Sequence, residues 1–550
     1  MVYFISVLFA LLLLRKLFIR LQLSKAKHPS LRGHAKMSKR VARLIPFYEY
    51  QDNEIFGVDG APESLQQQRR TAFYKLSHFF QENCPQSLIK SEEMEGQVSD
   101  VDFTQYYRVP FQFRNFVARE LKVSLMANAS RGTQVSDLDG NWSHDLTGAY
   151  GVNLYGYDFY KDCIDDGIRM TRGLGPVLGP YHAIIIDNVQ RLKKISGMDE
   201  VSFHMSGTEA VMQAVRLAHY HTKRTKTVVF CGAYHGWWDG VQPGIGNPRR
   251  VSDVYTLTEN CEDTLRVLRT RKDIACVLVN PLQALSQNAG STSDSMLIAS
   301  DRCAHYDKAQ YTIWLKKLRE VCSQKKIVLI FDEVFLGFRL AKGGAQEYFG
   351  VKADMVTYGK TLGGGLPVGV VCGKHENMKR FRVDAPADVC FARGTFNSHP
   401  YVMGSMNAFL TRLDLPEYSM AFQVIDDQWN QRAAYANSKL AEAKVPLKII
   451  NMSSIWIPVY TRPSRYNWML QYYLRAEGLL LPWIGTGRFI FSHNYSDEDF
   501  HHVVDKIVAA CLTMEADGWW WASAELSNKS IKKQVGKELF RAWFSSLHKA

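Results

Sequence analysis

Five short apolar runs rich in β-branched residues constrain the fold of this chain more than any other feature. Helical stretches separate several of these runs. Strands of a parallel sheet read as continuous apolar runs, because helices cover both faces of such a sheet. The sequence therefore predicts an α/β fold with a mostly parallel central sheet. The runs are KTVVF (226–230), ACVLV (275–279), IVLIF (327–331), DMVTY (354–358) and VGVVCG (368–373).

The positive charge of the chain is concentrated at its two ends. The 550 residues carry a formal net charge of +13. Ten Lys or Arg and no acidic residue lie between Arg15 and Arg43, and the last 24 residues hold six basic groups against Glu538. The middle of the chain is near neutral and shows neither zinc-ligand spacing nor a basic recognition helix. This pattern argues against a nucleic-acid-binding protein.

The N-terminal residues 2–14 are all apolar, aromatic or small, and Arg15 and Lys16 then interrupt the run. A bilayer-spanning helix needs about 20 apolar residues, although long basic side chains can snorkel. No basic segment precedes the run and no cleavage site follows it, which disfavours a signal peptide. We expect an anchor that contacts membrane lipid through residues 2–22, single-pass or monotopic, with the catalytic part on the cytoplasmic side. A helix lying in the membrane interface and an organelle presequence are the alternatives.

The last segment combines three adjacent Trp residues (519–521) with a periodic apolar pattern. Its spacing predicts an amphipathic helix that packs on its own domain. A second contact with a membrane surface is the alternative, because Trp and basic residues favour the interface. The periodic residues are Ile531, Val535, Leu539, Trp543 and Leu547.

Polar residues follow three of the predicted strands. Ligands of open α/β sheets bind at the carboxyl ends of the strands. IVLIF is followed by Asp332, DMVTY leads into Lys360, and VSFHM (201–205) leads into Ser206 and the start of a helix. Backbone N–H groups at a helix start favour phosphate. A phosphate cradle, a carboxylate and an amine together are what pyridoxal phosphate requires.

The chemistry of this coenzyme gives two of these residues a role. The coenzyme needs a lysine that forms the Schiff base and a carboxylate that keeps the pyridine nitrogen protonated. Lys360 and Asp332 fit these two roles. The glycines that follow Lys360 either let the backbone approach the cofactor or form a tight turn.

Residues 331–373, FDEVFLGFRLAKGGAQEYFGVKADMVTYGKTLGGGLPVGVVCG, closely resemble the same stretch of the class III aminotransferases. Within that family they resemble the glutamate-1-semialdehyde aminomutases most. The similarity covers roughly residues 130–510, because further motifs occur in the family's order. These motifs are SDLDGNWSHDLTGAYGVNLYG (136–156), SFHMSGTEAVMQAVRLA (202–218), CGAYHGWWDG (231–240) and ARGTFNSHP (392–400).

The resemblance implies the fold type I of pyridoxal-phosphate-dependent transferases. In this fold a large cofactor domain accompanies a smaller α+β domain built from both chain ends. The expected organisation is an anchor and basic segment (1–43), an N-terminal extension with part of the small domain (44–178), the large domain (179–420), the C-terminal small domain (421–515) and a Trp-rich tail (516–550).

The resemblance also assigns residues around the cofactor. Lys360 would be the Schiff-base lysine, and Asp332 the partner of the pyridine nitrogen. Ser206, Gly207 and Thr208 would hold the phosphate.

Five more residues take their expected roles from the family. Tyr234 would stack on the ring, and Val334 would pack against its other face. Gln283 could hydrogen-bond the phenolic oxygen. His235 would be either a neighbour of the cofactor or a structural histidine. Thr395 would reach the phosphate of the neighbouring subunit, which implies a homodimer.

One motif departs from the family. Where many members read Glu-Pro-x-Gln-Gly, this chain reads NPLQA (280–284), so Asn280 replaces the glutamate. In some members that glutamate pairs with an arginine, and Arg488 in GTGRFIFSH (485–493) resembles the arginine. Arg488 would then bind a substrate carboxylate bidentately, or pair with another acid. The amino donor stays open.

The expected function is that of a membrane-associated aminotransferase. It would move an amino group from an amino-acid donor to a carbonyl acceptor, such as a long-chain aldehyde or ketone. One alternative is an intramolecular amino shift of the glutamate-1-semialdehyde type. Decarboxylative condensation or racemisation on the same scaffold, and a catalytically silent tethered scaffold, are the others.

Overall fold

The computed structural model describes residues 2–249, 251–288, 304–482 and 487–547. The described residues form two compact units, each with its own internal contacts. The first unit draws on 1–42, 162–291 and 305–423, and the second on 43–161 and 424–550.

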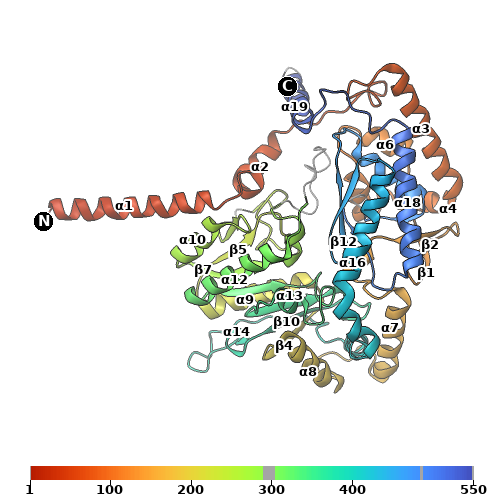
Figure 1. Ribbon diagram of the computed structural model, residues 1–550. Coiled ribbons are helices and arrows are strands. Elements are labelled where there is room, and N and C mark those ends of the chain that lie inside the picture. The colour runs from red at the N-terminus through yellow and green to blue at the C-terminus, as the bar shows by residue number, and fades with distance from the viewer. Residues whose placement is uncertain (1, 250, 289–303, 483–486, 548–550) are drawn as a thin grey trace. The chain divides into compact units, whose positions relative to one another are not determined.

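The central sheet of the first unit confirms the predicted α/β fold (Figure 1). All five apolar runs form strands, and neighbouring strands from β9 to β6 run parallel, whereas β10 runs antiparallel to both its neighbours. The order across the sheet is β4 (Glu200–His204), β10 (Gly369–Gly373), β9 (Met355–Gly359), β8 (Val328–Asp332), β7 (Ile274–Val279), β5 (Lys226–Phe230) and β6 (Val254–Leu257).

Helix α9 (Gly207–Thr222) packs along this sheet, against strands from β4 to β7. Ala210, Ala214 and Ala218 recur at i+4 and are fully buried, so the helix backbone can approach the strands closely. Its start therefore lies at the strand ends. The unit also contains α8 (Ile184–Ser196), α10 (Glu262–Thr270), α12 (Lys308–Lys325), α13 (Gly344–Phe349), α14 (His375–Met378), α15 (Pro400–Arg412) and the 3-10 turns η4 (Pro281–Leu285) and η5 (Lys360–Gly363).

The second unit contains two small sheets. All strand pairs in them are antiparallel, except that β13 runs parallel to β3. One sheet has the order β1 (Ala127–Arg131), β2 (Gln134–Asp137), β3 (Trp142–Asp145) and β13 (Leu479–Leu480), and the other β11 (Leu447–Met452), β12 (Ile455–Tyr460) and β14 (Phe489–Ile490). Its helices include α3 (Glu63–Asn83), α4 (Pro85–Met94), α5 (Ser99–Tyr106), α6 (Arg114–Glu120), α17 (Leu470–Ala476) and α18 (Asp497–Ala516).

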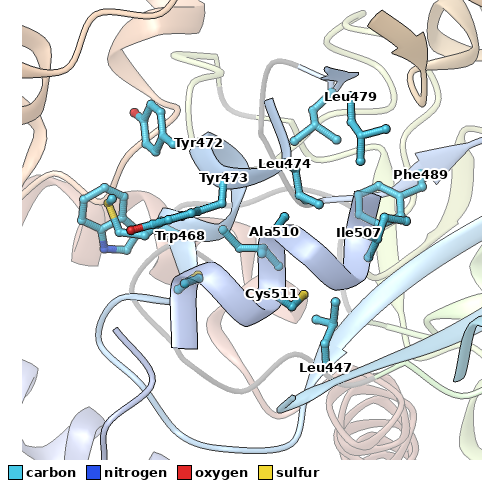
Figure 2. Close-up of a cluster of buried hydrophobic side chains, with 14 of the residues drawn as sticks. Leu447, Trp468, Tyr472, Tyr473, Leu474, Leu479, Phe489, Ile507, Ala510 and Cys511 are labelled. Carbon is cyan, nitrogen blue, oxygen red and sulfur yellow. The ribbon is translucent and has the colours of Figure 1, made fainter. Parts of the chain in front are cut away.

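The core of the second unit is rich in aromatic side chains. Figure 2 shows its centre, where Leu474 of α17, Ile507 of α18 and Phe489 of β14 lie together. A buried ion pair joins Arg69 of α3 to Asp59, with 2.7 Å between Nη2 and Oδ2. The unit thus has a hydrophobic core of its own.

The chain passes from one unit to the other within three helices. These are α2 (Ala35–Leu44), α7 (Tyr157–Thr171) and α16 (Pro416–Glu442).

The C-terminal segment packs on the second unit, which confirms the predicted amphipathic helix. In α19 (Asn528–Leu547), Ile531 is 1% exposed and Val535 is 4% exposed. The Glu538 carboxylate accepts hydrogen bonds from the hydroxyls of Tyr48 (2.8 Å) and Tyr50 (2.7 Å). Apolar burial and these hydrogen bonds both hold α19 in place.

The N-terminal segment forms a single helix, α1 (Val2–Lys25). In the four described stretches of the chain, no helix is both long enough and apolar enough to cross a membrane. The prediction of a membrane-spanning helix is therefore not supported. The physical reason is that Arg15, Lys16 and Arg20 interrupt the apolar run before it reaches about 20 residues.

The end of α1 belongs to the fold of the first unit. Ala26 is fully buried, and its carbonyl oxygen accepts a hydrogen bond of 2.8 Å from Thr258 N. The Thr270 hydroxyl donates to Gln22 Oε1 at 3.2 Å, where α1 packs on α10. The preceding turns of α1 extend away from α10 (Figure 1).

The buried contact of α19 predicts a measurable loss of stability. Ile531→Ala should lower the free energy of unfolding of the second unit by about 2–4 kcal/mol, because a buried side chain leaves a cavity. Urea unfolding followed by tryptophan fluorescence measures this. Phe540, which is 61% exposed on the same helix, is the matched control, and Phe540→Ala should change the midpoint little. Equal effects of the two changes would contradict the packing described here.

Candidate active site

The loops after β4, β5, β8 and β9 converge at one edge of the central sheet. Two glycines show how closely these loops approach one another. A Cβ atom on Gly207 would lie 2.5 Å from Val334 Cγ1, and one on Gly236 would lie 2.5 Å from Thr208 Oγ1. No side chain fits at such distances. The structure thus brings the residues after β4 against those after β8, and the loop that contains Tyr234 and His235 against the start of α9.

Asp332 is a buried carboxylate at the end of β8, with 4% of its surface exposed. Its Oδ2 lies 2.7 Å from Nδ1 of the buried His235. Its Oδ1 accepts hydrogen bonds from Val334 N (3.2 Å) and from the Thr357 hydroxyl (3.3 Å). These partners fix the orientation of the carboxylate.

Lys360 directly follows β9 and begins the turn η5. Burial lowers the pKa of its amine from 10.5 to about 8; the Asp332 carboxylate opposes this shift, and the Arg339 guanidinium adds to it. Its Nζ lies 4.8 Å from the ring centroid of Phe335. The backbone of Lys360 has φ +47°, a left-handed conformation that costs energy for a residue with a side chain. Such strain is typical of functional sites.

The start of α9 is capped by side chains. Ser206 Oγ accepts from Glu209 N at 3.2 Å, and Glu209 Oε2 accepts from Met205 N at 2.8 Å. Among the described residues, no group accepts a hydrogen bond from the backbone N–H of Gly207 or Thr208. These N–H groups lie at the positive end of the helix dipole and can bind an anion. Glu209 is structural, as its capping bond shows.

The buried polar atoms that have no hydrogen-bond partner within the described chain include two from residues that the family resemblance assigns to the cofactor. They are Oε1 of Gln283, in the turn η4 after β7, and Nε2 of His235. Native proteins pair nearly all buried polar atoms, because leaving them unpaired is costly. Both atoms are therefore suited to a bound polar ligand.

Asn280 organises the loop that carries Tyr234. Its Nδ2 donates to the Tyr234 carbonyl oxygen at 3.0 Å, and its Oδ1 accepts from Leu282 N at 3.2 Å. The Tyr234 side chain is 56% exposed, and partial burial, followed by the Asp332 charge, raises the pKa of its hydroxyl. The sequence did not predict this contact. Its only sequence signal was that Asn280 stands where many members of the family have a glutamate.

Phe335 and Arg339, next to Lys360, also went unrecognised in the sequence. They come three and seven residues after Asp332 in the chain, and their spacing carries no signal for a contact with the lysine. Two further predicted residues come from other parts of the chain. Thr395 is exposed between β10 and α15, and Arg488 precedes β14 in the second unit. Their roles stay predictions.

The architecture is similar to that of solved structures. The chain resembles a β-phenylalanine aminotransferase from Variovorax paradoxus with a TM-score of 0.65 and 23% identity, over 82% of this chain and 98% of that one. It resembles a glutamate-1-semialdehyde aminomutase from Pseudomonas aeruginosa with a TM-score of 0.65 and 18% identity, over 82% and 99%. The fold is the fold type I of pyridoxal-phosphate-dependent enzymes.

Sequence comparison gives the family. The model of the aminotransferase class-III family matches residues 116–511. Proteins named glutamate-1-semialdehyde 2,1-aminomutase from Methanocaldococcus jannaschii and Methanococcus maripaludis are each 33% identical, over 58% of this chain and 72% of theirs. The chain belongs to the class III aminotransferases, and its cofactor is pyridoxal phosphate.

The site residues fit this cofactor. A buried amine and a buried carboxylate adjoin an anion-binding helix start, and two unpaired polar atoms lie at the same strand ends. Gly207 has no side chain, so Val334 can pack closely against the start of α9, where the phosphate group would bind.

We predict that Asn280→Asp weakens cofactor binding about tenfold. The aspartate can still accept from Leu282 N, but its second oxygen would face the Tyr234 carbonyl oxygen instead of donating to it. Equilibrium dialysis of pyridoxal phosphate measures the effect.

Asn437 offers a matched control for this change. It makes the same pair of bonds in the second unit, donating to Ile449 O (2.9 Å) and accepting from Ile449 N (2.8 Å). Asn437→Asp should reduce stability and leave cofactor affinity unchanged. If Asn280→Asp also left the affinity unchanged, Asn280 would have no part in the site.

Proposed function

We propose that this enzyme moves an amino group from an amino-acid donor to a carbonyl acceptor. The observation that carries the proposal is the Lys360 amine, whose pKa is lowered to about 8 beside the buried Asp332. Near neutral pH such an amine exchanges its proton readily, so it can act both as a base and as an acid. Proton transfer at the substrate carbon is the step that amino transfer requires of a protein side chain.

The cofactor supplies, when bound, an aldehyde that takes up amino groups and a ring that accepts electrons. Asp332 would hold a proton at the ring nitrogen, and His235 would orient Asp332 through its Nδ1. Tyr234 and Val334 would fix the plane of the ring from its two faces. Lys360 would attach the cofactor and move the proton.

The remaining polar groups would position the cofactor. The backbone N–H groups of Gly207 and Thr208 and the Thr208 hydroxyl would bind the phosphate, with Ser206 holding the helix start in place. Gln283 would hydrogen-bond the phenolic oxygen and so satisfy its buried side chain. Arg488 would bind a substrate carboxylate.

A second candidate is an intramolecular amino shift. The names of the archaeal relatives favour it, because these proteins are aminomutases. Lys360 would make the same proton transfers in both reactions. In amino transfer the amino group passes from a donor molecule to a different acceptor molecule, whereas in the amino shift it stays within one substrate.

One experiment tests the proposal and separates the two candidates. The purified enzyme with cofactor is incubated with amino-acid donors and with short- and long-chain aldehydes or ketones, and products are identified by mass spectrometry. Transfer that needs an external donor supports the aminotransferase, whereas isomerisation without a donor supports the mutase. Lys360→Ala should lower either rate about 10²–10⁴-fold, and the exposed Lys317→Ala should not. Full activity in Lys360→Ala would refute the proposal.

We also propose a homodimer in which Thr395 reaches the cofactor phosphate of the neighbouring subunit. The exposure of Thr395 in this protomer supports such a role. In a symmetric dimer each site would then need residues from both chains.

Mixing two inactive variants tests the shared site. Lys360→Ala and Thr395→Ala homodimers should each be impaired. Unfolded together and refolded, they form heterodimers in which one site combines Lys360 from one chain with Thr395 from the other. About a quarter of wild-type activity should return if chains pair at random. No recovery, with heterodimers shown by native mass spectrometry, would place Thr395 in its own subunit's site or in neither.

We propose further that α1 attaches the enzyme to a bilayer, with the catalytic units on the cytoplasmic side. The exposed apolar side chains from Tyr3 to Leu14 and the basic residues after them support this attachment. A bilayer would concentrate acceptors that partition into it, such as long-chain aldehydes or ketones.

A further inference from the structure

We infer that exposed basic side chains in α1 and α2 bind the headgroups of an anionic lipid bilayer. The inference rests on the bilayer attachment proposed above and adds the class of lipid. We call these side chains the cationic belt. They are Arg15, Lys16, Arg20 and Lys25 of α1 and Lys36 and Arg40 of α2.

The protein itself does not neutralise the cationic belt. Across the described residues, no carboxylate lies within ion-pair distance of any of its six members. The acids of α10, the helix on which α1 packs, are already paired: Glu262 with Arg269 at 2.6 Å and Asp263 with Arg266 at 2.5 Å. The belt therefore presents an uncompensated positive charge to its surroundings.

The apolar part of α1 indicates what kind of surface the belt meets. From Tyr3 to Leu14 the large apolar side chains are 48–87% exposed. Successive residues of a helix lie about 100° apart, so this run, broken only by the small Ser6, covers every side of the helix and leaves no polar stripe for water. A protein groove would cover one side only, whereas a bilayer covers all of them. A bilayer is therefore the occupant that fits.

The position of the charges matches the headgroup layer. If the turns up to Leu14 enter the hydrocarbon, Arg15 and Lys16 follow at the membrane surface, where long basic side chains reach the headgroups. The docked residues Gln22 and Ala26 hold the end of α1 on the first unit. Lys39 Nζ of α2 donates to Arg249 O at 2.8 Å, so the basic residues of both helices are tied to the same unit. On α2, Met37 is half exposed between Lys36 and Arg40 in the sequence and can enter the interface.

The test compares vesicles of phosphatidylcholine alone with vesicles that also contain phosphatidylserine, using the full-length enzyme with its cofactor and co-sedimentation. The wild type should bind the anionic vesicles more tightly, and added salt should reduce the difference. The triple variant Lys25→Gln, Lys36→Gln, Arg40→Gln should bind anionic vesicles about 100-fold more weakly at low salt, at about fivefold per residue. Its binding to neutral vesicles should not change.

Two further variants separate this inference from the attachment itself. Deleting residues 2–14 removes the apolar turns but keeps Gln22 and Ala26, and should abolish binding to neutral vesicles. The control Lys316→Gln, Lys317→Gln, Lys325→Gln neutralises three exposed lysines of α12 and should bind like the wild type. Equal binding of the wild type to both vesicle types would overturn the inference and leave the attachment standing. Failure of the wild type to bind any vesicle would overturn both.

Discussion

The Asp332 carboxylate is buried at the end of β8, and the arrangement of the candidate site depends on it. Its partners at the strand ends are the His235 ring, the Thr357 hydroxyl and the Val334 backbone N–H. Burying a carboxylate is costly unless hydrogen bonds and a counter-charge compensate it. Lys360 supplies the nearby cation, and the same charge opposes the lowering of the lysine pKa by burial. Burial therefore lowers the proton affinity of the amine, and this one acid partly offsets the effect.

The predictable part of the site follows from local rules. Asp332, Lys360 and Ser206 each follow a buried apolar run, and parallel topology brings such strand ends to one edge of the sheet. The contact of Asn280 with the Tyr234 carbonyl was not predictable, because it depends on the path of a loop and on a backbone atom that carries no sequence signal. The place of Phe335 beside the lysine amine likewise depends on the turn that follows β8.

At the two chain ends, too, the local pattern was predictable from the sequence and the long-range contacts were not. The spacing of Ile531 and Val535 correctly indicated an amphipathic helix packed on its unit. At the N-terminus the apolar run was visible, but the docking of Gln22 and Ala26 was not, since their partners lie far along the chain. Thr258, whose backbone N–H donates to the Ala26 carbonyl oxygen, directly follows β6 at the edge of the central sheet. Any surface that binds α1 therefore orients this sheet as well, because no flexible linker separates the two.

We propose that the Lys360 amine is the group that holds the cofactor. The apoprotein is incubated with pyridoxal phosphate, the adduct is reduced with borohydride, and the labelled peptide is located by mass spectrometry. A single label is expected on Lys360, with a rate of attachment that rises with pH through about 8, where the amine loses its proton. A label on another lysine, or equal labelling of Lys360→Ala, would contradict it.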